Sequence, residues 1–101
     1  MLQDSANRQR IDKWLWHARM VRTRTDAASL VEAGHVRVNG ARVTAPAHPL
    51  RIGDVLTLAL DNSVRLVGVT GFSDRRGSAR EAAATFRLVE KSPGYRPQGA
   101  A

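Results

Sequence analysis

The sequence has 101 residues, 43% of them hydrophobic, which is enough for one domain with one modest core. Sixteen lysine and arginine residues outnumber nine aspartate and glutamate residues, so the formal charge is +7, and fourteen of the sixteen are arginine. This excess predicts a polyanionic partner, either nucleic acid or an anionic membrane surface. The absence of cysteine excludes disulfides and thiolate metal sites.

No apolar run approaches the roughly 18 residues of a membrane span, and the first residues lack the apolar segment of a signal peptide. We therefore expect a cytoplasmic protein without a membrane partner. Residues 1–7 are polar and are predicted to form a disordered leader. Residues 8–90 are predicted to form a single domain, and residues 91–101, rich in Pro and Gly, a flexible tail.

The first predicted helix covers residues 8–21. Its apolar residues recur at helical spacing and form one stripe, made of Ile11, Trp14, Leu15, Ala18 and Val21. Trp16 and Met20 lie off this stripe. Two interpretations remain open for them: coverage by the C-terminal part of the chain, which we favour, or an exposed stacking or partner site.

A second helix is predicted to begin at Thr23. The Thr23 hydroxyl can accept a hydrogen bond at the helix start, and Asp26 stands where it can reciprocate as in a capping box. Gly34 is placed to end this helix in the left-handed conformation. A β-hairpin of residues 35–38 and 41–44 follows, because Asn39-Gly40 is the strongest signal for a two-residue turn.

Residues 45–52 contain two prolines and are predicted to be a loop, ended by a turn at Gly53-Asp54. The segment VLTLAL, residues 55–60, is predicted to be a strand. A polar turn at residues 61–63 leads to a strand at residues 64–70, in which Gly68 is expected to mark a bulge.

Residues 73–77, SDRRG, are predicted to be a basic loop. Ser78 and Glu81 have capping-box spacing, so a third helix is predicted over residues 78–85. The segment FRLV, residues 86–89, fits either a continuation of this helix or a short strand.

The sequence offers little for catalysis. It contains no HExxH, GxSxG, P-loop or GxGxxG motif, and its acidic residues form no closely spaced pair. The histidines, His17, His35 and His48, lack the spacing of metal ligands and are expected to lie at the surface. We expect no enzyme activity, no cofactor and no metal. Asp12 is expected to complement the helix dipole and hold an arginine in place.

The basic residues are more informative. Residues 8–42 hold eight basic and three acidic side chains. Arg10 and Lys13 share a face of the first helix. Arg22 and Arg24 flank the start of the next helix, where free backbone N–H groups also favour phosphate. Each charge alone is an ordinary surface residue, but their concentration predicts salt-dependent contacts to phosphates. The charged residues of the helix start and hairpin are Arg22, Arg24, Arg37 and Arg42.

The segment RIDKWLWHARMVRTRTDAASLVEAGHVRVNG resembles the S-four-type RNA-binding domain, also called the αL motif. Its KWLW opening, and the later GDVLTL and RRGSAREAA segments, resemble the ribosome-associated fifteen-kilodalton heat-shock protein family. The resemblance covers about residues 8–90. It implies an α+β fold with two N-terminal helices packed on a small, mostly antiparallel sheet, and a further short C-terminal helix.

The resemblance also implies a non-enzymatic protein that binds ribosomal RNA of the large subunit and acts on stalled subunits, with possible contact to tRNA. The RNA-contacting residues implied by position are Arg10, Lys13, Arg19, Arg22, Thr23, Arg24, Arg37, Asn39 and Arg42. Asn39 also has a simpler interpretation, in which it serves only the turn. Longer members carry a basic C-terminal extension, whereas this chain ends in SPGYRPQGAA.

Two alternative functions remain open at this point. One is a generic module that binds tRNA, messenger RNA or ribosome-assembly intermediates. The other is a protein-interaction adaptor that uses Trp16 and Met20 as an apolar anchor. Nothing in the sequence demands a dimer, so we expect a monomer.

Overall fold

The computed structural model describes residues 8–60 and 63–93, with side chains described to Glu90. The predicted leader and most of the predicted tail therefore lie outside the described residues. The elements, in chain order, are β1 (Arg8–Arg10), α2 (Ile11–His17), α3 (Arg24–Glu32), β2 (Val36–Val38), β3 (Ala41–Arg42), β4 (Pro49–Arg51), β5 (Val55–Leu60), β6 (Ser63–Val69), α4 (Ala79–Ala82), a 3₁₀ turn (Ala83–Thr85) and β7 (Phe86–Pro93).

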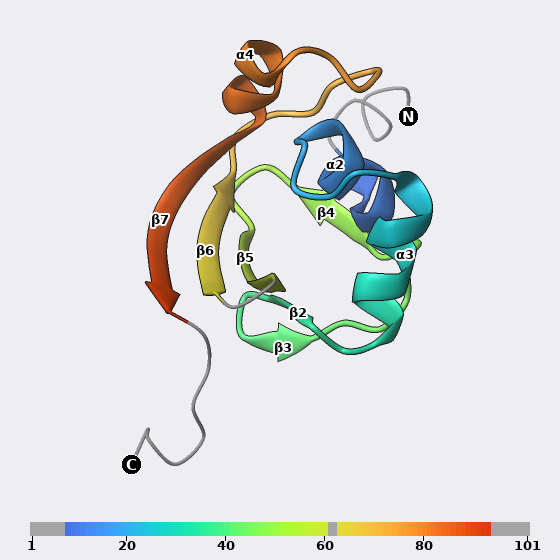
Figure 1. Ribbon diagram of the computed structural model, residues 1–101, viewed down its shortest axis with the longest axis vertical. Helices are drawn as coiled ribbons and strands as arrows, with labels where there is room; N and C mark the ends of the chain where they lie inside the picture. Colours follow the sequence, from blue (N-terminus) through green and yellow to red (C-terminus); the bar gives the residue numbers. More distant parts are fainter. Residues whose placement is uncertain (1–7, 61–62, 94–101) are drawn as a thin grey trace.

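The main sheet has five strands in the order β3-β2-β5-β6-β7, and every neighbouring pair is antiparallel. Helices α2 and α3 stand together against one face of this sheet, while α4 lies at one end (Figure 1). Along β5, Leu56, Leu58 and Leu60 are buried and alternate with half-buried residues, as expected for a sheet covered on one face. The predicted α+β class, with two N-terminal helices on a mostly antiparallel sheet and a short C-terminal helix, is confirmed.

The core lies between the two helices and the inner face of the sheet. Its largest fully buried side chain is Trp14, which packs in one cluster with Ile11 and Leu15 from the same helix and with sheet residues such as Val67. The indole Nε1 of Trp14 donates a hydrogen bond to the Gly71 carbonyl oxygen at 3.1 Å. The predicted apolar stripe is therefore the helix face that packs on the sheet.

The first helix is shorter than the predicted residues 8–21. Residues 8–10 instead pair as β1 with β4, a partner that sequence periodicity does not reveal. The helix ends early because Arg19 adopts φ 61°, the left-handed conformation. Two hydrogen bonds close the end, from Arg19 N to Trp16 O and from Met20 N to Leu15 O, which is the usual pattern of a left-handed helix cap.

The second helix and the hairpin follow the prediction closely. Thr23 caps α3, because its Oγ1 accepts a hydrogen bond from Asp26 N at 2.9 Å. Only this half of the predicted capping box is present at this helix. Gly34 ends the segment with φ 83°, and both turn residues, Asn39 and Gly40, have positive φ as a type I′ turn requires. The paired strands are shorter than predicted.

Two predictions between residues 45 and 69 need correction. Residues 49–51, predicted as loop, form β4, which tolerates Pro49 because its two-stranded sheet with β1 has only edges. The bulge expected at Gly68 is absent there: Gly68 pairs regularly with Val55 and Arg87. The register instead shifts at Leu66/Val67, where Val89 of β7 is passed over.

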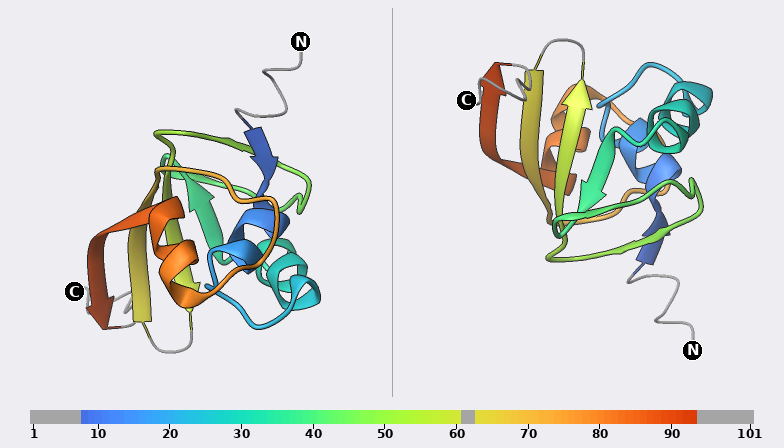
Figure 2. Two further views of the ribbon diagram at one scale, coloured as in Figure 1. Left: turned by 90° about the horizontal axis from the view of Figure 1, so that it is seen from above. Right: turned by 90° about the horizontal axis from the view of Figure 1, so that it is seen from below.

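The C-terminal part differs from the prediction mainly in how the third helix ends. Ser78 and Glu81 form the predicted capping box, but regular α-helix lasts only four residues before a 3₁₀ turn. Residues 86–93 form β7 and pair with β6, so the strand interpretation of FRLV is correct. The strand reaches Pro93, and the first residues of the predicted tail thus belong to the sheet. Figure 2 shows α4 beside the β6–β7 end of the sheet.

Candidate nucleic-acid interface

Asp12 is the centre of a small charged cluster at the helix starts. Its side chain is only 5% exposed, and both carboxylate oxygens accept hydrogen bonds from Arg10, at 3.0 and 2.9 Å. The Arg24 Nε lies 3.8 Å from the same carboxylate. One buried acid therefore hydrogen-bonds Arg10, just before α2, and pairs more loosely with Arg24 at the start of α3, as expected for Asp12. Both arginines keep about half of their side-chain surface exposed, 50% and 43%.

His17 is buried, contrary to the prediction of a surface histidine. Its Nδ1 lies 2.8 Å from the Ser73 carbonyl oxygen, so this nitrogen must carry the proton and donate it. Burial lowers the pKa of His17 below its usual value, and the nearby Lys13 and Arg24 charges lower it further, against the opposing effect of the Ser73 hydrogen bond. His17 is therefore a neutral structural group beside the cluster at physiological pH.

Arg19 stands between the two N-terminal helices and the C-terminal part of the chain. Its left-handed backbone costs an L-residue about 1 kcal/mol or more. The exposed side chain donates from Nη1 to the Gly77 carbonyl oxygen at 2.8 Å. Arg22 and Thr23 follow at the exposed start of α3, where the Thr23 oxygen is already used by the helix cap.

The hairpin carries the other candidate residues. Arg37 and Arg42 are both exposed and lie directly opposite each other on β2 and β3. Asn39, in contrast, is engaged within the protein: its Nδ2 donates to Asp54 at 3.1 Å, and its Oδ1 accepts from Val55 N at 2.9 Å. These bonds give Asn39 a structural role in joining the turn to β5.

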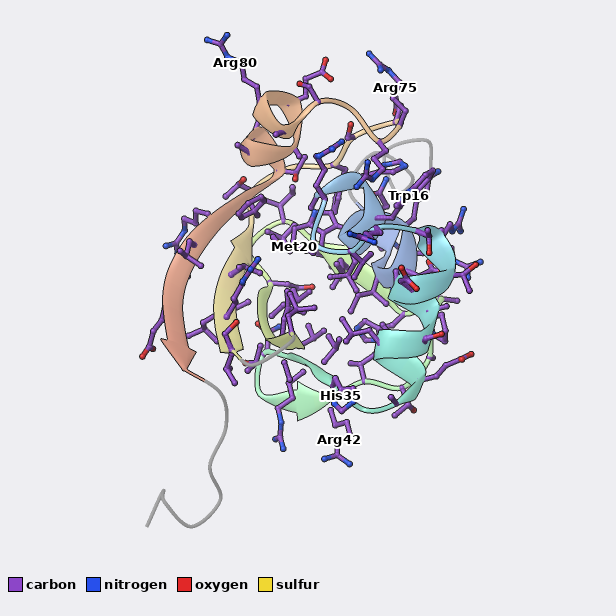
Figure 3. The ribbon with its side chains drawn as sticks, viewed as in Figure 1. Trp16, Met20, His35, Arg42, Arg75 and Arg80 are labelled. Atoms are coloured by element: carbon purple, nitrogen blue, oxygen red, sulfur yellow. The ribbon has the colours of Figure 1, made fainter. Side chains whose placement is uncertain are left out.

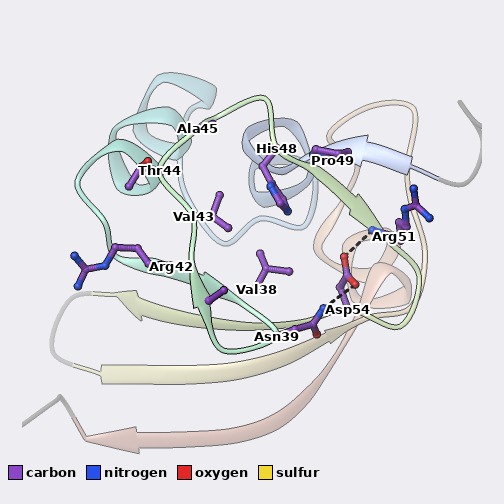
Figure 4. Close-up of a pocket in the computed structure, with 11 residues that line it drawn as sticks. Val38, Asn39, Arg42, Val43, Thr44, Ala45, His48, Pro49, Arg51 and Asp54 are labelled. Carbon is purple, nitrogen blue, oxygen red and sulfur yellow. Dashed lines mark hydrogen bonds between the residues drawn. The ribbon is translucent and has the colours of Figure 1, made fainter.

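A groove of about 630 Å³ opens beside the hairpin, between β3 and the loop that leads to β4 (Figure 4). Val38 and Val43 lie in its middle, and His48 points toward them from the loop. Arg42 and Arg51 stand at opposite ends of the groove. Asn39 and Arg42 therefore border a hollow that is apolar in its middle, with Arg42 at one end and Arg51 beside Asp54 at the other.

The nine candidate residues form two groups rather than one. One group surrounds the start of α3 and consists of Arg10, Lys13, Arg19, Arg22, Thr23 and Arg24. The other lies on the hairpin, where the Arg42 side chain packs beside Gly34, just beyond the last turn of α3. Nine helical residues at 1.5 Å each separate the two ends of α3 by about 13 Å. A single ligand that contacts both groups must therefore be larger than one nucleotide.

Trp16 and Met20 are both partly buried, but the C-terminal part of the chain bonds only to the backbone of Trp16, so coverage of the two side chains by that part stays a prediction. Met20 packs against the core, and Trp16 is half-buried with its ring 5.3 Å from that of His17. Arg76 from the C-terminal part donates to the Trp16 carbonyl oxygen at 3.2 Å and to that of Val21 at 3.3 Å. Arg76 is a positioning residue that the sequence analysis missed, because its acceptors lie more than 50 residues away along the chain.

Among residues 8–60 and 63–93, no three His, Asp or Glu side chains gather as a metal site would require. In that same part of the chain, no helix is long and apolar enough to cross a membrane.

Comparison with known proteins agrees with the resemblance seen in the sequence. Residues 9–56 match the model of the S4 domain. Heat shock protein 15 of Escherichia coli K12 is 36% identical over 92 residues, which cover 91% of this chain and 68% of that protein. The chain belongs to the heat shock protein 15 family. Because S4 domains and this family bind RNA, it is an RNA-binding protein.

Two further relatives show how much of this chain is shared with known proteins. A solved trimeric structure of heat shock protein 15 from Vibrio cholerae superposes with a TM-score of 0.77 at 36% identity, covering 81% of this chain and 82% of that one. Small ribosomal subunit protein uS4 of Rhodopseudomonas palustris is 38% identical over 48 residues, 48% of this chain but 23% of that protein. The ribosomal protein therefore shares only a segment, whereas heat shock protein 15 shares nearly the whole chain.

Proposed function

We propose that this protein is a non-enzymatic, cytoplasmic RNA-binding protein that docks on structured ribosomal RNA of the large subunit and acts in the rescue or recycling of stalled subunits. The observation that carries the proposal is the buried Asp12, which holds Arg10 and Arg24 beside the start of α3. Guanidinium groups fixed in this way meet phosphates without first losing side-chain freedom. Membership of the heat shock protein 15 family supports the choice of a ribosomal partner.

The binding mechanism is electrostatic docking with recognition of shape. Arg10, Lys13, Arg22 and Arg24 contact phosphates near the helix starts, Arg19 extends this contact, and Arg37 and Arg42 contact them from the hairpin. Thr23 and Asn39 orient the backbone and approach sugar or base edges. All these groups come from one chain, so we propose that a monomer is the unit that binds RNA. Because the Vibrio cholerae relative is a trimer, the number of chains in the RNA complex should be measured directly.

The test is a salt series of binding to large-subunit ribosomal RNA. If all seven of these basic side chains contact phosphates, the log–log slope should be about −6 on a duplex-like site. The double variant Arg22→Glu, Arg24→Gln should weaken binding and make the slope shallower by about 2. Arg24 becomes Gln because a new carboxylate beside Asp12 would disturb the fold. Arg87→Ala, on β7, is the charge-loss control.

Unchanged affinity in the double variant would overturn the site assignment. Sedimentation through a ribosome profile tests the finer part of the proposal: co-migration with free large subunits supports it, and absence from them favours a generic module for tRNA, messenger RNA or assembly intermediates. The mass of the RNA complex by light scattering decides between one chain and three. The adaptor alternative loses support because Met20 packs against the core.

A further inference from the structure

The basic loop of residues 73–77 has no role in the proposed site, yet it is tightly bound to the helices that carry that site. Six side-chain hydrogen bonds join it and the preceding Gly71 to residues 9–21. Four of them run from N-terminal side chains to loop carbonyl oxygens, and two run back from Arg76. The four donors are Gln9, Trp14, His17 and Arg19.

These contacts fix the loop in place even though it has no regular structure of its own. The Ser73 carbonyl oxygen accepts from both Gln9, at 2.9 Å, and His17, at 2.8 Å. At the other end, the Gly77 carbonyl oxygen accepts from Arg19 at 2.8 Å. Two charged side chains at the tip and just beyond it, Arg75 and Arg80, are thereby carried on a rigid base, and a rigid base lowers the entropy lost when a ligand binds.

Arg75 and Arg80 are both free to meet a ligand. Figure 3 shows them pointing into solvent at the same end of the molecule, opposite the end that bears Arg42. Arg75 is 75% exposed, and its nearest carboxylate, that of Glu81, is 3.8 Å away and itself 56% exposed. Such an exposed ion pair contributes little to stability, so Arg75 can readily exchange the Glu81 carboxylate for a phosphate. Arg80 has no ion pair within the described residues.

The loop also adjoins two residues of the proposed site. Arg19 bonds directly to Gly77, and the Val21 carbonyl oxygen, which accepts from Arg76, immediately precedes Arg22. Residues 19–24 and 73–81 together hold six arginines against two acids, Asp74 and Glu81. One oxygen of Glu81 is occupied by the capping box at Ser78. The positive surface at the start of α3 therefore continues onto the loop and α4.

We propose that Arg75 and Arg80 form a second phosphate-binding surface, which extends the RNA interface beyond the αL motif to the loop 73–77 and α4. Its ligand is the sugar-phosphate backbone of the same structured RNA, bound by guanidinium groups through paired N–H donors. Arg76 and Arg19 act as positioning residues that set this surface against the helices. The inference rests on the proposed RNA-binding function.

The test uses the full chain, large-subunit ribosomal RNA and the double variant Arg75→Ala, Arg80→Ala. Both side chains are exposed, so the melting temperature should stay near that of the wild type. We expect affinity at about 0.1 M salt to fall roughly tenfold for each lost phosphate contact, and the log–log slope to become shallower by about 2. The control is Arg87→Ala, whose side chain lies over Gly68 on the sheet face turned away from α2 and α3.

The outcomes separate this inference from the proposed function. A steep wild-type slope that Arg22→Glu, Arg24→Gln weakens, but Arg75→Ala, Arg80→Ala leaves unchanged, overturns only the second surface. An equal loss in the Arg87→Ala control also overturns it, because the effect would then reflect net charge alone. A flat wild-type slope overturns both proposals. Arg80→Glu should weaken binding more than Arg80→Ala if a phosphate lies beside it.

Discussion

Several polar residues have structural roles that their residue type alone does not predict. His17, outside the apolar stripe in the sequence, is buried and bonded to Ser73. Arg19 occupies a left-handed position where glycine is usual. Asn39 and Asp54 fasten the hairpin turn to β5. In each case a polar side chain is satisfied by a backbone or carboxylate partner far away in the sequence.

The buried His17 predicts a pH dependence of stability. Because its folded-state pKa lies below the unfolded value of about 6.5, the unfolded chain binds the extra proton more readily. The free energy of unfolding should therefore fall as pH drops below about 6.5 toward the lowered pKa. His17→Asn keeps a donor for Ser73 but does not titrate. Its stability profile from pH 7.5 to 5, measured by urea unfolding, should be flatter than that of the wild type; parallel profiles would contradict the assignment.

At the scale of elements, the sequence predicts that the first helix runs to residue 21. In the structure the helix ends earlier, and Arg19 and Val21 contact the loop 73–77 instead. The helix stops at His17, and its exposed carbonyl oxygens need partners. Arg76 donates to two carbonyl oxygens here: that of Trp16, in the last turn, which also accepts from Arg19 N, and that of Val21, beyond the helix end. A charged donor and backbone acceptors thus join two parts of the chain that sequence patterns treat separately.

Removal of this arginine should loosen the junction. Hydrogen bonds from charged groups contribute about 1.5–3 kcal/mol each, and the two here are long, so Arg76→Ala should cost about 1–3 kcal/mol of unfolding free energy. For a domain near 100 residues this lowers the melting temperature by several degrees. The neighbouring Arg75→Ala, at an exposed side chain, is the matched control and should stay within about 0.5 kcal/mol. Equal melting temperatures for both variants would contradict a positioning role for Arg76.

At the scale of the whole molecule, the segment that matches the S4 domain does not supply all the residues of the core in which it packs. Residues 9–56 contain Trp14, but the indole acceptor is Gly71, and Val67 and Val69 of β6 complete the buried cluster. Without β6, the strand β5 becomes an edge and exposes its backbone donors and acceptors. We therefore expect the domain to fold as one unit that includes the C-terminal strands.

A truncated chain tests this unity. A fragment of residues 1–60 should show no cooperative thermal transition by circular dichroism, because it lacks the partners of Leu56 and Leu58 on β6. A chain ending at Pro93 keeps every described element and should unfold in one transition, like the full chain. A sigmoidal transition in the short fragment, near the melting temperature of the full chain, would show that the αL segment folds alone.

By itself, the sequence determined whatever depends on local geometry. The cap at Thr23, the positive φ at Gly34, Asn39 and Gly40, the apolar stripe of Trp14 and Leu15, and the Ser78 box follow from neighbours within four residues. The α+β class and the family follow from the same local signals. The RNA-contacting residues remain predictions from position.

The features that join distant segments became visible in the folded chain alone. The fold pairs β1 with β4, ends the first helix at His17, buries that histidine and moves the bulge from Gly68 to the Leu66/Val67 step. It also brings Arg76 to α2 and so places the basic loop beside Arg19 and Arg22. These outcomes depend on which backbone and side-chain groups meet once distant segments pack together, and local spacing carries no information about that.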